Sequence, residues 1–507
     1  MPEARFRAAF LLMAAFLPGD AAARPLAPVS EITAPRGAAR LLPCAGRRET
    51  SDALCGTVSV FENRAAGRGR RIDLHVVVLR AIGGGGSSQP PLFPLEGGPG
   101  LAATDGVGLW ETELKPFRRN RDIVLLDQRG TGASNPLRCS RETRDAGDFL
   151  ADMYPLEYVR RCRSELETKA DLTRYSTSAA ADDIEDVRRA LGYGRIDLIG
   201  LSYGSRLALV TLRQHPKSVH AAVLMGLTPT WARLPLFHAA NAQRALTLLL
   251  EDCAAEASCK AAYPDLPGDL ARVAEALGAA PATVSAAWPA GSPPKTVSIT
   301  RDVFFETLRR QMYEPETSRG LPAVLHAAAA GNYAPFLAVA LPAGDGRDRA
   351  ADGLYLSITC SEDTSRITPA EAERTTARTV FGRYRIDQQR RACAIWPTKA
   401  LPARYFRDVR SSVPVLILSG GRDPVTPPAW ATRAARKLSR SRHVVVPLSA
   451  HLENGLDDVA CWDGVVLSFL DRGTAEGLDV SCLARLKPAP FDVGPPIAGD
   501  RAEKPAN

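Results

Sequence analysis

Residues 195–209, RIDLIGLSYGSRLAL, constrain the fold of this chain more than any other stretch. The first half is a short apolar run typical of a buried strand, and the second half has the spacing of a helix. Between them lies the pattern Gly-x-Ser-x-Gly, formed by Gly200, Ser202 and Gly204. Glycines allow a sharp strand-to-helix turn that lifts the serine hydroxyl above the sheet, beside free N–H groups at the helix start. The stretch predicts a nucleophile at Ser202; the plainer alternative is an ordinary tight turn.

Short apolar strands and amphipathic helices alternate on both sides of this turn. Other strands are predicted for residues 56–62, 72–79, 91–95, 122–126, 221–225, 413–418 and 443–447. A helix is predicted for residues 179–191, because Ile184, Val187 and Leu191 share one face. This alternation is typical of the α/β class, with a mostly parallel central sheet and helices on both faces.

The alternation stops near residue 228 and returns near residue 412. The region between is rich in Ala, Pro and Arg, with helices predicted for residues 234–255 and within residues 321–341. We interpret it as a large, mainly helical cap inserted over the carboxyl edge of the sheet. The predicted organisation is therefore a signal peptide (1–23), a first core part (24–227), the cap (228–411), a second core part (412–487) and a disordered tail (488–507).

The first residues resemble a secretory signal peptide. Arg5 and Arg7 precede an apolar core at residues 8–17, and residues 21–23 offer an Ala-x-Ala cleavage site. The apolar core is too short to cross a bilayer, and no other stretch approaches the needed length, so no stable membrane insertion is expected. The net charge of +8 is spread along the chain without interleaved aromatic residues, which argues against nucleic-acid binding. We expect export to the periplasm or the medium; the oligomeric state stays open.

The cysteine pattern agrees with export. Ten cysteines occur as five local couples, which are Cys44 and Cys55, Cys139 and Cys162, Cys253 and Cys259, Cys360 and Cys393, and Cys461 and Cys482. None of them has zinc-site spacing. In an oxidising compartment the simplest pairing is sequential, although the spacing does not fix the connectivity.

A serine nucleophile needs a histidine base, and that base needs a carboxylate to hold its tautomer. Of seven histidines, only His451 lies in a loop just past the carboxyl end of a predicted core strand. Asp423 ends the preceding core strand in a Gly-Gly-x-Asp-Pro turn, with Thr426 placed to bond it. The order Ser202, Asp423, His451 is that of α/β-hydrolases, whereas the rival acids at residues 457–458 follow the histidine.

Two backbone N–H groups are expected to bind the oxyanion of the reaction. One is that of Tyr203, directly after the nucleophile, and the other comes from the glycine-rich loop at residues 97–100, with Gly98 preferred and Gly97 next. No lysine follows this loop, so it is not a phosphate-binding P-loop. Proton transfer and these donors suffice for the reaction, so no metal and no organic cofactor are implied.

Taken together, these motifs resemble the prolyl iminopeptidase and tripeptidyl aminopeptidase family of α/β-hydrolases. The matching segments are residues 97–100 (GGPG), 127–134 (DQRGTGAS), 200–204 (GLSYG) and 423–427 (DPVTP), together with His451. Cys461 and Cys482 resemble the C-terminal region of the secreted tripeptidyl aminopeptidase-like members. The resemblance implies a serine exopeptidase that removes short N-terminal units from peptides with a free N-terminus. Glu96 stands where the iminopeptidases carry a histidine, which puts prolyl specificity in question.

An aminopeptidase must bind the α-ammonium of its substrate, which calls for carboxylates above the site. Glu362 and Asp363, directly after Cys360, are predicted to do this, with loop acids facing solvent as the plainer reading. Glu306, Glu314 and Glu316 in the cap are the alternatives.

Two other functions compete with the aminopeptidase hypothesis. A carboxylesterase or lipase-like hydrolase would use the same triad, and an apolar slot without carboxylates in the cap would favour it. The third is an inactive α/β-hydrolase that serves as a binding module, against which the intact Ser202, Asp423 and His451 argue.

Overall fold

The computed structural model describes residues 32–33, 39–44, 52–83, 87–139, 145–341 and 350–494. The segment interpreted as a signal peptide lies outside these residues, as do residues 495–507 of the tail expected at 488–507. The first part of that tail differs from the prediction, because Phe491 is buried against the molecule and its N–H donates to Glu256 at 3.0 Å.

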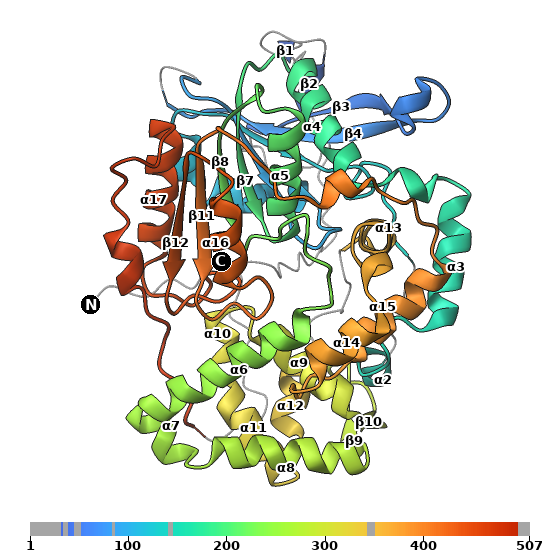
Figure 1. Ribbon diagram of the computed structural model, residues 1–507, viewed down its shortest axis with the longest axis vertical. Coiled ribbons are helices and arrows are strands. Elements are labelled where there is room, and N and C mark those ends of the chain that lie inside the picture. Colours follow the sequence, from blue (N-terminus) through green and yellow to red (C-terminus); the bar gives the residue numbers. More distant parts are fainter. Residues whose placement is uncertain are drawn as a thin grey trace, which may run out of the picture.

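A ten-stranded sheet forms the centre of the molecule (Figure 1). Its strands are β1 (Ile32–Thr33), β2 (Arg40–Pro43), β3 (Leu54–Phe61), β4 (Arg71–Leu79), β5 (Leu92–Leu95), β6 (Ile123–Leu126), β7 (Ile196–Leu201), β8 (Val219–Met225), β11 (Val415–Gly420) and β12 (Ser441–Val446). The order is β1-β2-β3-β4-β6-β5-β7-β8-β11-β12. Pairing is antiparallel from β1 to β6 and parallel from β6 through β5 to β12. The predicted α/β class is confirmed, and Ser202, Asp423 and His451 follow strands of the parallel half of the sheet.

Helices cover both faces of the sheet, which explains why the central strands are apolar runs rather than alternating sequences. One face packs on α4 (Thr177–Ala190), α5 (Tyr203–Gln214) and α16 (Pro428–Ala435), and the other on α1 (Val107–Glu111) and α17 (Val459–Arg472). Every residue of β5, β6 and β11 is buried between these layers. Two further helices, α2 (Ala146–Phe149) and α3 (Leu156–Glu167), lie between β6 and α4 in the chain.

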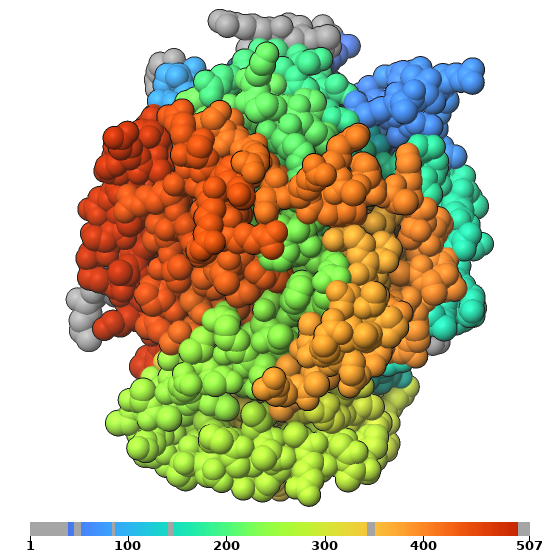
Figure 2. Space-filling view, viewed as in Figure 1, coloured from blue at the N-terminus to red at the C-terminus, as the bar shows by residue number. Residues whose placement is uncertain are grey.

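The cap lies between β8 and β11 in the chain and has a hydrophobic core of its own. Its elements are α6 (His238–Ala255), α7 (Ala257–Ala262), α8 (Leu266–Ala279), β9 (Ala282–Ala286), β10 (Lys295–Ile299), α9 (Arg301–Gln311), α10 (Pro315–Ser318), α11 (Leu321–Ala329), α12 (Ala334–Ala340), α13 (Asp352–Glu362), α14 (Pro369–Thr376) and α15 (Tyr384–Ile395). In the space-filling view its green and yellow-green residues form one end of the molecule and meet the orange-red C-terminal core (Figure 2).

Three details of the cap differ from the sequence analysis. The helix predicted to begin at residue 234 begins at His238, because Pro235 lies in the loop before it. The helix expected within residues 321–341 is two helices, interrupted at Gly331, whose φ of +81° ends the first one. The antiparallel hairpin of β9 and β10 was not predicted.

All ten cysteines form disulfides in the predicted sequential order. Cys360 and Cys393 join α13 to α15 within the cap, and Cys461 and Cys482 tie α17 to the segment that follows it. The sequential pairing is thus confirmed. Across the described residues, no helix combines the length and the hydropathy needed to cross a membrane.

Candidate active site

Ser202 stands on a strained turn between β7 and α5. Its φ is +56° and its ψ is −119°, a conformation that costs on the order of 1–3 kcal/mol for a residue with a side chain. The glycines of the motif are required by close packing. A Cβ on Gly204 would lie 1.8 Å from the Leu95 carbonyl oxygen, and one on Gly200 would lie 2.5 Å from the Gly204 carbonyl oxygen. The sequence forms this turn because only glycine fits on either side of the serine.

Asp423 and His451 form a buried pair at the carboxyl ends of β11 and β12. His451 Nδ1 lies 2.8 Å from Asp423 Oδ2. The carboxylate also accepts the N–H groups of Val425 and Thr426 at 2.7 and 2.8 Å, and the Thr426 hydroxyl at 2.6 Å. Burial raises the pKa of Asp423, but His451 and the Thr426 bonds outweigh it and hold that pKa below its usual value. An ionised carboxylate only accepts, so Nδ1 of His451 carries the proton and Nε2 is left as a hydrogen-bond acceptor.

The sheet brings Ser202 and His451 to the same edge. The Ser202 N–H donates to the Met225 carbonyl at 2.9 Å, where β8 ends. The next residue, Gly226, has a φ of +53°, and a Cβ there would lie 2.8 Å from His451 Cε1. Glycine at this position therefore lets the imidazole approach the turn that carries the serine. The rival acids at residues 457–458 accept backbone N–H groups around α17 instead.

The glycine-rich loop after β5 packs directly on Ser202. A Cβ on Gly97 would lie 3.4 Å from Ser202 Cβ. The Gly97 N–H donates to the half-buried Glu96 carboxylate, whose pKa is raised to about 7 by burial and by Asp105. The neighbouring Gly98 adopts a φ of +105°. Tyr203 is the first residue of α5, so its N–H has no acceptor within the helix. The structure thus keeps Gly98 and Tyr203 as the two candidate oxyanion donors.

Glu362 and Asp363 lie beside α5, the helix that follows Ser202. Both are buried, and Asp363 holds the two Nη atoms of Arg206 in α5 at 2.9 and 3.0 Å. Glu362 accepts the Thr177 N–H and the Thr177 hydroxyl, each at 2.8 Å, and the Tyr405 hydroxyl. The prediction that this pair receives a substrate ammonium disagrees with the structure, because both carboxylates are buried and already have partners.

The same network reaches one of the candidate oxyanion donors. The Tyr203 hydroxyl lies 3.1 Å from Thr177 Oγ1, which in turn donates to Glu362. Burial raises the pKa of Glu362, although Arg206 and the Tyr405 hydroxyl oppose the rise. Glu362 is thus connected to the side chain of Tyr203 through Thr177.

A cap segment lies against the loop that carries His451. The Tyr313 ring meets the His451 ring edge-on with centroids 5.0 Å apart, and the Tyr313 carbonyl accepts the Leu452 N–H at 2.9 Å. The half-buried Glu314 follows. Burial, together with the like charges of Glu316 and Glu453, raises its pKa to about 7. In the sequence analysis, Glu314 and Glu316 were named only as alternatives. The contacts that bring this segment beside the loop of His451 join residues more than 100 positions apart in the sequence.

Comparisons with known proteins agree with this architecture. The family model described as alpha/beta hydrolase fold matches residues 90–259, and the one described as TAP-like protein matches residues 378–482. Serine protease Hip1 of Mycobacterium tuberculosis is 23% identical over 474 residues, which cover 85% of this chain and 87% of that protein. Tripeptidyl aminopeptidase of Streptomyces lividans is 23% identical over 472 residues, covering 86% and 84%. Proline iminopeptidase of Neisseria gonorrhoeae is 31% identical over 138 residues, covering 27% and 32%.

Proposed function

We propose that this chain, a serine hydrolase of the α/β-hydrolase superfamily related to tripeptidyl aminopeptidases and proline iminopeptidases, is an exported aminopeptidase. It would release short N-terminal units from peptides. One observation carries the proposal. The buried pair of Asp423 and His451 stands beside the strained Ser202 turn at the sheet edge, beneath a cap that contributes carboxylates.

The proposed reaction is acyl transfer to Ser202. His451 Nε2 takes the hydroxyl proton while Oγ attacks the scissile carbonyl carbon, and Asp423 stabilises the imidazolium that forms. The N–H groups of Gly98 and Tyr203 receive the negative charge of the carbonyl oxygen. When the C–N bond breaks, His451 returns the proton to the leaving amine. Water, activated by the same histidine, then hydrolyses the acyl-enzyme and frees the N-terminal unit.

For the amino end of the substrate we propose Glu314 at the cap edge, in place of Glu362 and Asp363. Removing an ammonium from water costs several kcal/mol unless an anion receives it. Glu314 lies one residue from Tyr313, which packs on His451, and its charge is disfavoured by Glu316 and Glu453. A substrate cation would relieve that repulsion.

Export is supported by the cysteines. Five disulfides are typical of proteins that fold in an oxidising compartment, such as the periplasm or the extracellular medium.

The test is hydrolysis of a panel that contains free-amino mono-, di- and tripeptide substrates, N-blocked peptides and short acyl esters, with Ser202→Ala as the inactive control. We expect turnover of free-amino peptides, and labelling of the wild type by a fluorophosphonate at Ser202 alone. Turnover confined to esters would assign an esterase instead, and labelling of a different serine would overturn the site.

A further inference from the structure

Helix α13 lies in the cap part of the chain, but it packs with the core of the sheet. Its side chains belong to the same hydrophobic cluster as those of β7 and α5, and the cap has a separate cluster; the residues are Leu354, Leu356, Ile358 and Cys360. The helix is buried along almost its whole length. Because packed interiors deform little, a displacement at one end of such a helix is felt at the other.

The N-terminal end of α13 holds the glycine-rich loop. The N–H of Ala351, the residue before the helix, donates to the Gly100 carbonyl at 2.9 Å. The two backbones lie so close that a Cβ on Gly100 would be 3.0 Å from Ala351 N. Gly98, a candidate oxyanion donor, folds back on the same residue, since a Cβ on Gly98 would lie 2.8 Å from Gly100 N. A displacement of α13 at this end would therefore reach Gly98 through Gly100.

The C-terminal end of α13 holds the first turn of α5. Glu362, its last residue, is connected to the Tyr203 hydroxyl through Thr177. Asp363, directly after it, pairs with both Nη atoms of Arg206 at 2.9 and 3.0 Å. Residues three apart on a helix share a face, so the contacts to Tyr203 and Arg206 restrain the turn that begins with the other candidate oxyanion donor.

Two links hold α13 against α15, which lies beside it in Figure 1. One is the disulfide between Cys360 and Cys393. The other is the hydrogen bond from Trp396 Nε1, directly after α15, to Ser357 Oγ at 3.1 Å. Removing either link leaves the bonds to Gly100 and Arg206 intact. A variant at these links therefore perturbs α13 without deleting its contacts to the loop or to α5.

We propose that α13 positions both oxyanion donors, Gly98 at one end and Tyr203 at the other, and that the Cys360–Cys393 disulfide holds the helix in the place where their spacing is productive. The inference rests on the proposed acyl-transfer site and adds the element that supports it. Oxyanion donors are effective because they are preorganised around the position where charge develops. The 11 residues of α13 span about 16 Å, so one helix joins two donors that belong to different loops.

The decisive variant is Cys393→Ser, which breaks the disulfide at its half-buried end and leaves the buried Cys360 in place. Cys482→Ser is the matched control, because it breaks the disulfide to Cys461, also at a half-buried cysteine, on the other face of the sheet. Both variants should lose stability, since a disulfide constrains the unfolded chain. Only Cys393→Ser should alter the oxyanion hole.

Three quantities are measured for each variant. They are kcat and KM for a short acyl ester, which has no ammonium to bind, and the Ki of a peptide aldehyde. The aldehyde forms a tetrahedral adduct with Ser202 and so resembles the transition state. Its Ki does not depend on the amount of folded enzyme, so it separates displaced donors from partial unfolding. Denaturant unfolding gives the stability of each variant.

We expect Cys393→Ser to lower kcat about tenfold with KM unchanged, which corresponds to about 1.4 kcal/mol. Such a loss is typical of an interaction made only in the transition state, and the Ki of the aldehyde should rise by a similar factor. Cys482→Ser should keep the wild-type kcat, KM and Ki. If Cys393→Ser does not fold, Ser357→Ala, which removes the second link, should change kcat and Ki in the same direction.

An unchanged Ki in the folded variant, or an equal rise in Cys482→Ser, would overturn the positioning role of α13. Ester hydrolysis that depends on Ser202 would then leave the proposed active site standing. A wild type that hydrolyses neither esters nor peptides, or a Ser202→Ala variant with wild-type turnover, would overturn the proposed function instead.

Discussion

Glu362→Gln tests whether the network behind α5 positions an oxyanion donor or binds substrate. The amide keeps the shape of the side chain, and its oxygen can still accept the Thr177 N–H. Its NH₂ group then faces two hydroxyls, those of Thr177 and Tyr405, both of which can rotate to accept. The variant should therefore fold, with weaker bonds in the same places.

The magnitude follows from the bonds that change. Hydrogen bonds to a charged group contribute roughly 1.5–3 kcal/mol, against roughly 0.5–1.5 kcal/mol for neutral ones, so three weakened bonds cost about 3 kcal/mol. Removing a desolvated charge that also repels Asp363 offsets part of this cost. We expect a net loss of about 1–2 kcal/mol for Glu362→Gln, and a loss of about 3–5 kcal/mol for Glu362→Ala, which leaves Arg206 partly unpaired and the donors without an acceptor.

The catalytic effect should be equal on peptides and on small acyl esters, because both need the Tyr203 N–H. A donor that is displaced rather than lost should cost about tenfold in kcat, less than the roughly 100- to 1000-fold of a missing donor. The assay is kcat/KM for both substrate types, with denaturant unfolding as the stability readout. Glu275→Gln is the control, because that side chain is exposed on α8 and its substitution should change neither quantity. Loss confined to free-amino peptides would refute the positioning role and restore the ammonium-binding one.

Two further outcomes follow from the site. Asp423→Asn should lower kcat by about 10⁴-fold on all substrates, because an amide no longer enforces the Nδ1–H tautomer of His451. The folded-state pKa of Asp423 lies below its usual value, so the stability that its carboxylate contributes is present above about pH 4 and is lost as the pH falls through the folded pKa. The free energies of unfolding of the variant and the wild type should therefore converge in acid. Burial and the like charges of Glu316 and Glu453 raise the pKa of Glu314 to about 7, so kcat/KM for free-amino peptides relative to esters should rise as the pH passes 7, and Glu314→Gln should make this ratio independent of pH. Because the pKa is raised, the folded state loses stability as Glu314 ionises, so the same variant should gain more stability over the wild type at pH 8 than at pH 5. A wild-type kcat/KM ratio that does not change with pH would exclude Glu314 as the ammonium partner.

The core of the candidate site was predictable because parallel strands end at one edge. Ser202, Asp423 and His451 each follow a strand, so a two-residue error in a strand boundary leaves them together. The glycine motif was informative for a steric reason, since a Cβ at Gly204 would overlap the Leu95 carbonyl. The orientation of Glu362 and Asp363 was not predictable. Helix α13 is buried almost all round, so its sequence carries no periodic signal of which face meets α5.

The cap contacts could not be predicted either, because they join residues far apart in the chain. Arg385 meets Glu306 across 79 residues, and Arg244 reaches Asp423 across 179. Charged residues at such separations look like ordinary surface positions in a sequence, and only packing of the cap buries them.

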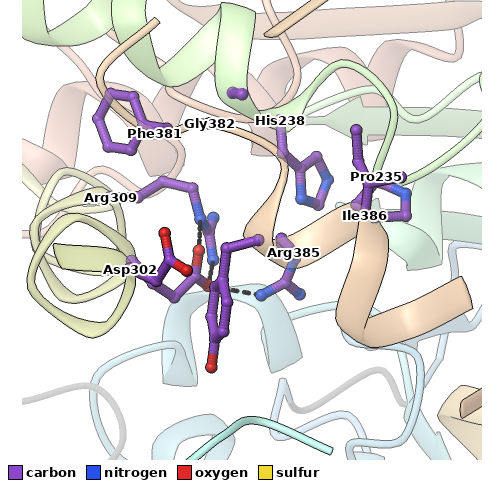
Figure 3. Close-up of a pocket in the computed structure, with 11 residues that line it drawn as sticks. Pro235, His238, Asp302, Arg309, Phe381, Gly382, Arg385 and Ile386 are labelled. Atoms are coloured by element: carbon purple, nitrogen blue, oxygen red, sulfur yellow. Dashed lines mark hydrogen bonds and ion pairs between the residues drawn. The ribbon is translucent and has the colours of Figure 1, made fainter. Parts of the chain in front are cut away.

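The cap is hydrogen-bonded to the turn that carries Asp423. In α6, Arg244 donates to the carbonyls of Gly421 and Asp423 at 2.8 and 2.7 Å, and Asn241 donates to that of Val425 at 2.7 Å. These carbonyls lie on the same turn whose N–H groups hold the Asp423 carboxylate. One face of a single helix thus fixes the turn, while its first residue, His238, lines a small pocket between α6, α9 and α15 (Figure 3). A change that tilts α6 should therefore also displace this turn, and with it the hydrogen bond between Asp423 and His451.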